Sequence, residues 1–423
     1  MSEDGVPTTP SEPDPSGTGG SWTDLRWLVN ADPQRVLEVP VPGAELVAAV
    51  YRASLDIHRD APPWVRRQLL ALDVARYGDR ELSQRLAAVP VADADPEPWR
   101  VRWSTGTRED PYSRINPSGH TGGVKAVVTA LLDGRRVVVS GSDDQSVRVR
   151  DLDTGRPVGE PMSGSDGRVW AVATEEVDGR PHAVTAGDWA VRVWDLTTRR
   201  RTAELPGISG EVWCVGTAVV RGRPCALASD DDTAVRIWDL AGGEQIGELT
   251  GHDDFLMAVE TWVVEGRPHA VACMSGGAVW TWDLTTGQPV GEPLAGHDGE
   301  AWALATAVVG GRPHAITAGH DATVRVWDLA TGRETGRLAG HEGTVSAVAT
   351  TVIGGDVRIV TGGSDGTVCL WDPATGRQIG RELVFPAPVH TLTVTPHGTL
   401  VTGFGNDIAA LTPAPPDPEP PTP

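Results

Sequence analysis

The sequence predicts an all-β repeat fold, a β-propeller of seven four-stranded antiparallel blades closed by an N-terminal strand and preceded by a small α-helical module. A Trp-Asp pair begins at positions 194, 238, 282, 327 and 371, so successive copies are 44 or 45 residues apart. A degenerate copy, Arg150-Asp151, precedes them at the same spacing. Each period also holds four short β-branched runs separated by turn residues, the pattern of four antiparallel strands. Repeats of this size bury their faces only against neighbouring repeats, so one period forms one blade.

The runs of one repeat follow in a constant order. A Gly-His pair or its remnant opens the unit, as at Gly340-His341, and a first apolar run follows. A turn, often Asp-Gly-Arg-Pro or Gly-Gly-Arg-Pro, leads to a second apolar run, such as residues 314–317. An alternating third run ends in Trp-Asp, as over residues 323–327, and a ragged fourth run closes the unit. Six such units extend from Gly119 to about Leu383.

These residues resemble the WD-repeat β-propeller family over roughly residues 98–412. The resemblance implies a buried tetrad of His, Ser or Thr, Asp and Trp in each complete unit. Buried polar groups must satisfy one another, so we expect a structural role and no catalytic His-Asp pair. The tetrad positions are His297, Thr317, Asp321 and Trp327 in the fifth unit, His341, Thr361, Asp365 and Trp371 in the sixth, and His120, Ser140 and Asp144 in the first. The first unit has Arg150 in place of Trp, the second and third lack the His, and the fourth has Gly276 in place of Asp.

The last blade requires a strand from the other end of the chain. Residues 389–394, 400–402 and 407–411 supply only three strands, and a three-stranded blade leaves an exposed edge that proteins avoid. Residues 99–103 alternate like a strand and belong to no repeat. In the family that the sequence resembles, an N-terminal strand commonly completes the last blade. We therefore expect seven blades, with 99–103 beside 407–411, and an open six-bladed ring is the alternative.

Three further segments flank the ring. Residues 1–21 and 413–423 are rich in Pro and polar residues, and we expect both tails to be disordered. The remaining segment, residues 22–97, predicts a helical module with helices around residues 24–29, 46–55 and 64–75 and a last helix over 81–88 that Asp79 caps. Similar helical stretches precede the propeller in some multidomain actinobacterial WD-repeat proteins, where they join it to protease-like or NTPase domains. Neither effector is recognisable in this sequence.

Composition narrows the possible partners. The net charge of −21 argues against nucleic acid and anionic membranes, which both attract a cationic surface. No apolar stretch approaches the length of a membrane span, and the N-terminus lacks a secretion signal. The four cysteines show no paired metal spacing, so we expect a cytoplasmic protein without metal or cofactor. Lys125 is the only lysine among the 36 Lys and Arg residues, a bias typical of GC-rich bacterial genomes.

Three motifs suggest chemistry but have structural explanations. Residues 362–366 fit the Gly-x-Ser-x-Gly pattern, yet they lie in a strand-to-strand turn, and a nucleophile elbow needs a strand-to-helix turn. The Asp triplet at residues 230–232 supplies too few oxygens for calcium. His182, His269 and His314 recur by repeat duplication on separate sheets, which lie too far apart to share one metal ion.

The remaining candidates surround the channel mouth on the top face, where partners commonly dock in the family that the sequence resembles. They begin the innermost strand of a repeat, precede that position by two residues, or stand just before the tetrad Asp. We expect the partner-binding residues to be Arg168, Trp170, Glu211, Trp213, Asp231, Phe255, Met257, Glu300, Trp302 and His320. Tryptophan is enriched at interface hot spots, and indoles beside carboxylates suit a cationic group. The alternative is that the indoles pack sideways between blades and plug the channel.

The sequence therefore favours a non-catalytic scaffold whose top face binds a protein or peptide partner, most readily a segment bearing Arg or Lys. One alternative is a propeller enzyme, a hydrolase or lyase with its site at the channel mouth. Such a site needs converging His and carboxylate groups, whereas the rim histidines, His320 and His390, belong to non-adjacent units. Another alternative is a regulatory sensor domain for an effector on another chain.

Overall fold

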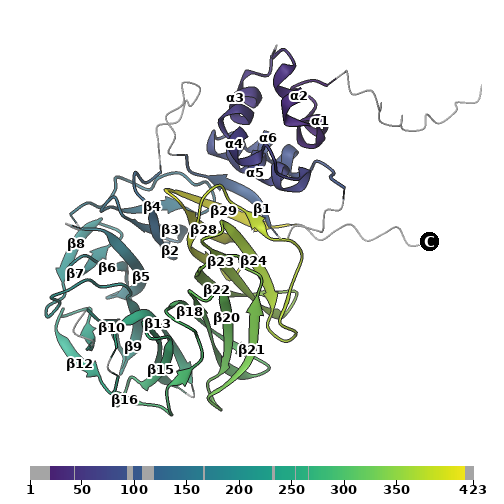
Figure 1. Ribbon diagram of the computed structural model, residues 1–423. Helices are drawn as coiled ribbons and strands as arrows, with labels where there is room; N and C mark the ends of the chain where they lie inside the picture. The colour runs from purple at the N-terminus through teal and green to yellow at the C-terminus, as the bar shows by residue number, and fades with distance from the viewer. Residues whose placement is uncertain are drawn as a thin grey trace, which may run out of the picture.

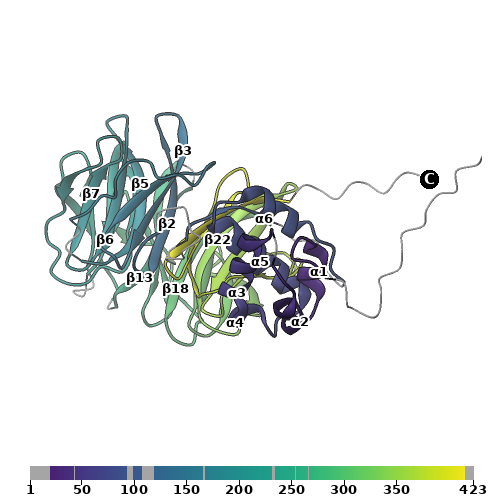
Figure 2. The same ribbon diagram turned by 90° about the horizontal axis from the view of Figure 1, so that it is seen from above.

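In the part of the chain that the structure describes, seven β-sheets stand around a common axis, and six helices lie together beside one of them (Figures 1 and 2). This computed structural model describes residues 20–41, 43–92, 99–106, 119–164, 167–230, 234–252, 254–264 and 266–414. The predicted seven-bladed, all-β propeller with an N-terminal helical module is confirmed. The tails expected to be disordered, residues 1–21 and 413–423, lie outside the described residues except for 20–21 and 413–414, and Pro413 is the last residue of a strand.

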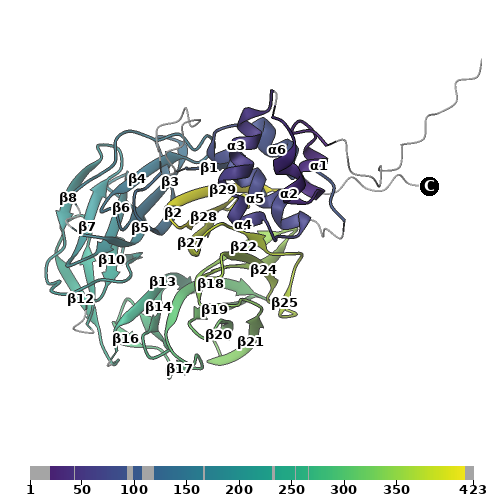
Figure 3. The same ribbon diagram turned by 45° about the horizontal axis from the view of Figure 1, so that its top comes forward.

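In each blade the first strand of the repeat lies nearest the axis, and the following strands lead outward (Figure 3). Blade 1 consists of β2 (Val124–Leu132), β3 (Arg135–Ser142) and β4 (Val147–Asp151). Blade 2 consists of β5 (Val169–Val177), β6 (Arg180–Gly187), β7 (Ala190–Asp195) and β8 (Arg200–Glu204). Blade 3 consists of β9 (Gly216–Val220), β10 (Arg223–Ala228), β11 (Val235–Asp239) and β12 (Gln245–Leu249). In blade 1 the place of a fourth strand is taken by two isolated bridges, Val147 to Met162 and Arg150 to Pro157.

The other blades follow the same plan. Blade 4 consists of β13 (Leu256–Val264), β14 (Arg267–Met274), β15 (Ala278–Asp283), β16 (Gln288–Pro289) and β17 (Leu294–Ala295). Blade 5 consists of β18 (Ala301–Val309), β19 (Arg312–Gly319), β20 (Thr323–Asp328) and β21 (Arg333–Ala339). Blade 6 consists of β22 (Val345–Ile353), β23 (Asp356–Gly363), β24 (Thr367–Asp372), β25 (Arg377–Gln378) and β26 (Leu383–Val384). Blade 7 consists of β27 (Val389–Val394), β28 (Leu400–Phe404), β29 (Asp407–Pro413) and β1 (Trp99–Ser104).

Strand β1 closes the ring as predicted. It pairs antiparallel with β29, from Trp99 opposite Pro413 to Ser104 opposite Ala409, and so becomes the outer strand of blade 7. Both tryptophans of β1 are buried, and Trp103 Nε1 donates to the Leu152 carbonyl at 2.8 Å. Because Leu152 belongs to blade 1, β1 joins the last blade to the first.

Two local devices shape the blades. The hairpins between inner and second strands turn over two residues with positive φ, such as Asp133 (50°) and Gly134 (76°), which matches the twist of paired strands. Threonine hydroxyls then join neighbouring inner strands. Each donates to the carbonyl of the equivalent threonine in the preceding blade: Thr174 to Thr129, Thr217 to Thr174, Thr261 to Thr217 and Thr350 to Thr306.

The helical module has its own apolar core. Its helices are α1 (Leu25–Asn30), α2 (Pro33–Glu38), α3 (Glu45–Ala53), α4 (Leu55–His58), α5 (Pro63–Arg76) and α6 (Arg80–Ala87). Trp22, Leu28, Tyr51 and Leu70 are buried together in its centre. Asp79 caps α6 as predicted, because its side chain accepts from Leu82 N at 2.9 Å. Helix α2 was not expected from the sequence.

Helix α5 attaches the module to the ring. It lies on β1, and its Leu72 belongs to the same buried cluster as Trp99, Phe385 and Leu411 of blade 7. The Gln68 side chain accepts from Val384 N at 2.9 Å, which extends the contact to the end of blade 6. The module therefore packs on the outer edge of blade 7 and leaves the axis of the ring uncovered (Figures 1 and 3).

Candidate functional site

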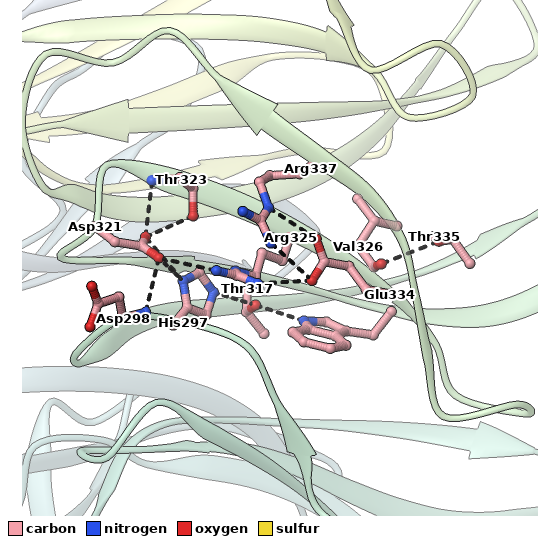
Figure 4. Close-up of polar contacts among 11 residues, drawn as sticks. His297, Asp298, Thr317, Asp321, Thr323, Arg325, Val326, Glu334, Thr335 and Arg337 are labelled. Carbon is pink, nitrogen blue, oxygen red and sulfur yellow. Dashed lines mark hydrogen bonds and ion pairs between the residues drawn. The ribbon is translucent and has the colours of Figure 1, made fainter.

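The tetrad of blade 5 is a continuous chain of hydrogen bonds (Figure 4). His297 Nδ1 lies 3.1 Å from Asp321 Oδ1, His297 Nε2 lies 2.7 Å from Thr317 Oγ1, and Trp327 Nε1 lies 2.9 Å from the same hydroxyl. A carboxylate only accepts, so His297 donates from Nδ1 and accepts the Thr317 hydroxyl proton at Nε2. The hydroxyl oxygen then accepts the indole N–H, and every group in the chain is satisfied.

Blade 6 repeats this arrangement. His341 Nδ1 lies 3.0 Å from Asp365 Oδ2, and His341 Nε2 lies 2.7 Å from Thr361 Oγ1. Trp371 Nε1 donates to Thr361 Oγ1 at 2.8 Å. The tetrad holds together the segment before the inner strand, the second strand and the third strand of the blade.

Blade 1 keeps three members of the tetrad. His120 contacts Asp144 at 3.0 Å and Ser140 Oγ at 2.7 Å. Arg150 takes the place of the indole and is only 1% exposed. Its Nη1 donates to the Gly155 carbonyl at 3.1 Å, while its buried Nε has no partner among the described residues. Burial lowers the pKa of Arg150 to about 10.

At neutral pH the tetrad side chains His120, His297 and Asp321 each keep one protonation state. Burial lowers the pKa of His120 and His297, although the adjoining carboxylates act in the opposite direction. Burial would raise the pKa of Asp321, but hydrogen bonds from the Thr323 hydroxyl, the Asp298 backbone and His297 outweigh it and lower the pKa to about 2. A neutral imidazole beside an ionised carboxylate suits a permanent hydrogen-bond network.

Blades 2 to 4 satisfy their indoles in other ways. Trp194 Nε1 still donates to the Thr185 hydroxyl at 2.9 Å. Blades 3 and 4 have alanine at the position of this hydroxyl, and their indoles donate to backbone carbonyls instead: Trp238 to Pro206 at 3.0 Å and Trp282 to Thr250 at 3.1 Å. Blade 2 also lacks the tetrad His, so the carboxylate of Asp188, at the Asp position of the tetrad, is available for other contacts.

The candidate binding residues of the inner strands stand on β-bulges. In six blades the pairing of the inner with the second strand skips one residue near its start. The skipped residues are Lys125, Trp170, Met257, Trp302, Ser346 and His390. A bulge takes its side chain out of the regular alternation, and such kinks are common beside functional sites. In blade 3, Trp213 precedes β9 and lies outside the strand.

Trp170 and Trp213 form an aromatic pair between blades 2 and 3. Their ring centroids lie 5.0 Å apart, and both side chains are half-buried. Arg168 Cζ lies 4.6 Å and Lys125 Nζ 5.2 Å from the Trp170 ring, and Trp170 Nε1 donates to Asp188 Oδ1 at 3.1 Å. The pair is therefore packed sideways in part, as the alternative interpretation proposed, and its cations come from the chain itself.

Both cations of this cluster form ion pairs with carboxylates of the chain itself. Arg168 Nε lies 3.3 Å from Asp188 Oδ2, and Arg168 Nη2 lies 3.6 Å from Glu211 Oε1. Lys125 Nζ lies 3.4 Å from Asp143 Oδ2. A cation from a partner would compete here with Arg168 and Lys125.

The other expected binding residues lie in different surroundings. Trp302 is 36% exposed, Phe255 and Glu300 are half-buried, and His320 is exposed. Within the described residues Glu300 forms no ion pair, and its carbonyl accepts from His320 N at 2.9 Å. Met257, on the equivalent bulge of blade 4, is only 7% exposed and therefore offers little surface to a partner. Asp231 lies outside the described residues.

Trp189 is the most exposed aromatic of the top face and was not expected from the sequence. It stands in the turn between β6 and β7 with φ 67° and is 64% exposed. The same turn position has positive φ in other blades, where it holds Gly277 and Gly366 without strain but also Gln145 and Ala322. A bulky tryptophan there is conformationally unfavourable. The signal in the sequence is an indole where sister repeats have Gly, Gln or Ala.

A cavity of about 290 Å³ lies between the helical module and blade 7. Val50 and Ile57 of the helices and Phe404 of β28 line it, together with Arg76 and Asp407. Arg76 forms ion pairs with both Asp73 and Asp407, whose side chain is 3% exposed. This network joins α5 to blade 7 at the cavity wall.

The described ranges contain no group of three or more His, Cys, Asp or Glu side chains placed to hold a metal ion. Nor does any helix in that part of the chain have the length and apolar character needed to cross a membrane. The four cysteines are free and buried, and burial raises the pKa of the Cys225 thiol to about 11.

Comparison with protein families identifies the repeats. The family model "WD domain, G-beta repeat" matches residues 113–151, 287–328 and 332–372. These segments end at the Asp of the third strands of blades 1, 5 and 6, the blades that keep the His, hydroxyl and Asp contacts. A search among curated proteins found no match to the chain. The chain is therefore a seven-bladed β-propeller in which three stretches match WD40 repeats.

Proposed function

We propose that the chain is a non-catalytic, cytoplasmic scaffold that binds a protein or peptide partner at the top face of the propeller. The top face is the end of the ring that carries the tetrads and the turns between second and third strands. WD40 propellers are commonly used for protein–protein interaction, and that general role is the starting point of the proposal. The buried free thiols are consistent with a reducing compartment.

The exposed tryptophans of the top face carry the proposal. Trp189 is 64% exposed on a strained backbone, and Trp302 is 36% exposed on a bulge. Exposure of large aromatic side chains to water is unfavourable, so a partner that covers them lowers the free energy of the complex. Tryptophan is also enriched at interface hot spots.

The carboxylates determine which partner is favoured. Glu211 already pairs with Arg168, but Glu300 is two residues from Trp302 and has no ion pair among the described residues. An indole beside an unpaired carboxylate attracts a cation through both the ring quadrupole and the charge. We therefore expect a partner segment with Arg or Lys that contacts Trp302 and Glu300 and an apolar group that covers Trp189.

Affinity capture with the tagged full-length chain tests the proposal, with captured proteins identified by mass spectrometry. The double variant Trp189→Ala, Trp302→Ala should lose the partner while its melting temperature stays within about 1–2 °C, because both side chains are exposed. Glu300→Gln should weaken binding of a basic segment by about tenfold, and added salt should weaken it further.

Ile246 supplies the matched control. It is 42% exposed and lies on the outer strand β12, not in a turn of the top face. Ile246→Ala should therefore leave capture unchanged. Retention of the same partner by the folded double variant would contradict the proposed surface. A large loss of stability in that variant would instead assign a packing role to the two indoles.

A further inference from the structure

A second set of exposed apolar side chains lies at the opposite end of the ring. Five of the eleven exposed large hydrophobic side chains of the described residues occupy one and the same position in five blades. They are Leu131, Val219, Val263, Val308 and Val352, with exposed fractions of 61, 54, 68, 62 and 61%. Each stands one residue before the end of the pairing with the second strand, opposite Arg136, Pro224, Pro268, Pro313 and Val357.

This position is next to the hairpin turn between the inner and second strands. In an antiparallel blade that turn lies at the end away from the tetrads, so the five side chains are on the lower face. Blades 3 to 6 are consecutive, and their inner strands contact one another. Val219, Val263, Val308 and Val352 therefore recur at one position on four adjacent blades beside the axis, and this set is here named the lower arc. Glu176 takes the position in blade 2 and separates Leu131 from the arc.

Folding alone does not account for the lower arc. Scattered apolar residues are ordinary on protein surfaces, whereas a contiguous apolar patch marks an interaction site. A polar residue serves the same position in blade 2, where Glu176 pairs with Pro181 in the same register and is exposed. The strand pairing therefore does not require valine at this position in the four blades of the lower arc.

Arginines border the arc and determine the charge that a partner meets. Arg223, Arg267 and Arg312 each pair with the Asp of the Trp-Asp motif of their blade. The three guanidinium side chains are 63, 73 and 63% exposed, whereas their carboxylate partners are only 14, 12 and 5% exposed. These carboxylates also accept backbone N–H groups of the following turns. The approachable groups are thus guanidiniums, on a chain whose net charge is −21.

We propose that the lower arc is a second docking surface, for an acidic peptide segment of a partner protein with aliphatic or aromatic side chains between its carboxylates. The apolar side chains cover the valines, and the carboxylates pair with Arg223, Arg267 and Arg312 in the bidentate geometry that arginine favours. The partner differs in charge from the one proposed for the top face, so the two faces can hold two different proteins at once.

The test selects peptides from a phage-displayed library of random 12-residue sequences on the immobilised Trp189→Ala, Trp302→Ala variant, which lacks the contacts proposed for the top face. The selected peptides should be enriched in Asp, Glu and large apolar residues. Their synthetic copies should bind Val263→Asp, Val308→Asp at least tenfold more weakly, because the new carboxylates repel the ligand and remove its apolar contact. They should bind Val290→Asp and Trp189→Ala as they bind the unmodified chain, since Val290 is exposed outside the arc.

A second variant covers a failure of the first to fold. Arg267→Glu, Arg312→Glu leaves the valines in place and should also weaken the acidic peptides at least tenfold. Selection of peptides without an acidic bias, or equal affinity for a folded arc variant, overturns the proposal. So does sedimentation that shows a dimer dissolved by Val263→Asp, Val308→Asp, because a second copy of the chain would then cover the arc. Loss of top-face capture leaves this result unaffected, and the two proposals can fail separately.

Discussion

At the scale of single residues, each complete tetrad depends on one hydroxyl that serves two neighbours. Thr317 Oγ1 contacts His297 Nε2 at 2.7 Å and Trp327 Nε1 at 2.9 Å, and Thr317 is fully buried. Its hydroxyl donates once and accepts once, so neither water nor another side chain is needed to complete the network. Loss of the hydroxyl leaves an acceptor and a donor unsatisfied in the same cavity.

Thr317→Val should therefore destabilise the chain by about 1–3 kcal/mol, the cost of buried polar groups without partners. The change is nearly isosteric, so the effect measures the hydrogen bonds and not the packing. Urea unfolding followed by tryptophan fluorescence gives the difference. Thr335→Val is the control, because Thr335 is exposed and its hydroxyl bonds only to the Val326 carbonyl. Equal midpoints for both variants would show that the tetrad contributes no stability.

The tetrads also predict a loss of stability in acid. The pKa of His120 and His297 is lowered from 6.5, so the unfolded chain binds more protons than the folded one once the pH falls below about 6.5. The pKa of Asp321 is about 2 against an ordinary 3.8, so its contribution is present above about pH 4 and disappears as the pH falls toward 2.

Urea midpoints between pH 7.5 and 2.5 should accordingly decrease, with the first part of the decrease beginning near pH 6.5. The double variant His120→Asn, His297→Asn should show a smaller first part and keep the part below pH 4; some of the first part should remain, because burial also lowers the pKa of His58 and His390. A midpoint that rises between pH 7 and 5 in the unmodified chain would mean that the imidazoles are protonated in the folded state.

The resemblance to WD repeats identified the tetrad residues, since the hydroxyl, the carboxylate and the indole follow the His at the constant intervals of that family. Exposure was harder to predict. Met257 and Trp302 occupy equivalent bulges, yet one is buried and the other is at the surface. Trp189 was missed because the turn that holds it departs from the motif, and its positive φ is not visible in a single sequence.

At the scale of elements, α5 is the link between the two parts of the chain. Its apolar face covers β1, and its last residue, Arg76, reaches between Asp73 of the same helix and Asp407 at the start of β29. Asp407 also accepts from the Thr105 hydroxyl at 3.0 Å. The ion pairs lie at the wall of the cavity and therefore act with little screening by solvent.

Asp407→Asn should destabilise the attachment of the module by about 3–5 kcal/mol, because it leaves the buried Arg76 with one carboxylate fewer. Limited proteolysis should then cut before β1 earlier than in the unmodified chain, and the melting temperature should fall. Asp56→Asn is the control, since Asp56 pairs with Arg59 on the exposed surface of the same module. Unchanged proteolysis in Asp407→Asn would show that apolar contacts alone hold the module.

Long amphipathic helices were predictable and short ones were not. The spacing of Val65, Leu69 and Leu72 indicated α5, and Pro63 begins it as its first residue. Helix α2 has only six residues, and its start depends on the Asp32 side chain that accepts from Gln34 N. Periodicity cannot be read over so few residues, whereas a cap followed by proline is a weak signal that the sequence does carry.

At the scale of the whole molecule, closure of the ring depends on β1. This strand is separated from β29 by about three hundred residues of chain, and its indoles anchor it on both sides. Trp99 Nε1 donates to the Gly398 carbonyl of blade 7, and Trp103 Nε1 to Leu152 of blade 1. The edge-strand argument predicted this pairing from sequence, because three strands without a partner leave unpaired backbone groups.

Trp103→Ala should lower stability by about 3–5 kcal/mol, the cost of truncating a buried aromatic side chain. Thermal unfolding followed by circular dichroism measures the shift. Arg100→Ala changes an exposed residue of the same strand and should have little effect. A shift no larger than that of Arg100→Ala would mean that the ring holds together without the closing strand.

The uneven distribution of the tetrads has a consequence for motion. Blades 5, 6 and 1 keep their His-to-Asp contacts, and blades 6 and 1 flank blade 7, where the helices attach, whereas blades 2 to 4 have lost that cross-link. Local opening costs less where fewer buried bonds tie a segment to its sheet. Backbone amides of blades 2 to 4 should exchange with deuterium sooner than those of blades 5 and 6. A ligand bound to Trp189 should slow the exchange in blades 2 to 4.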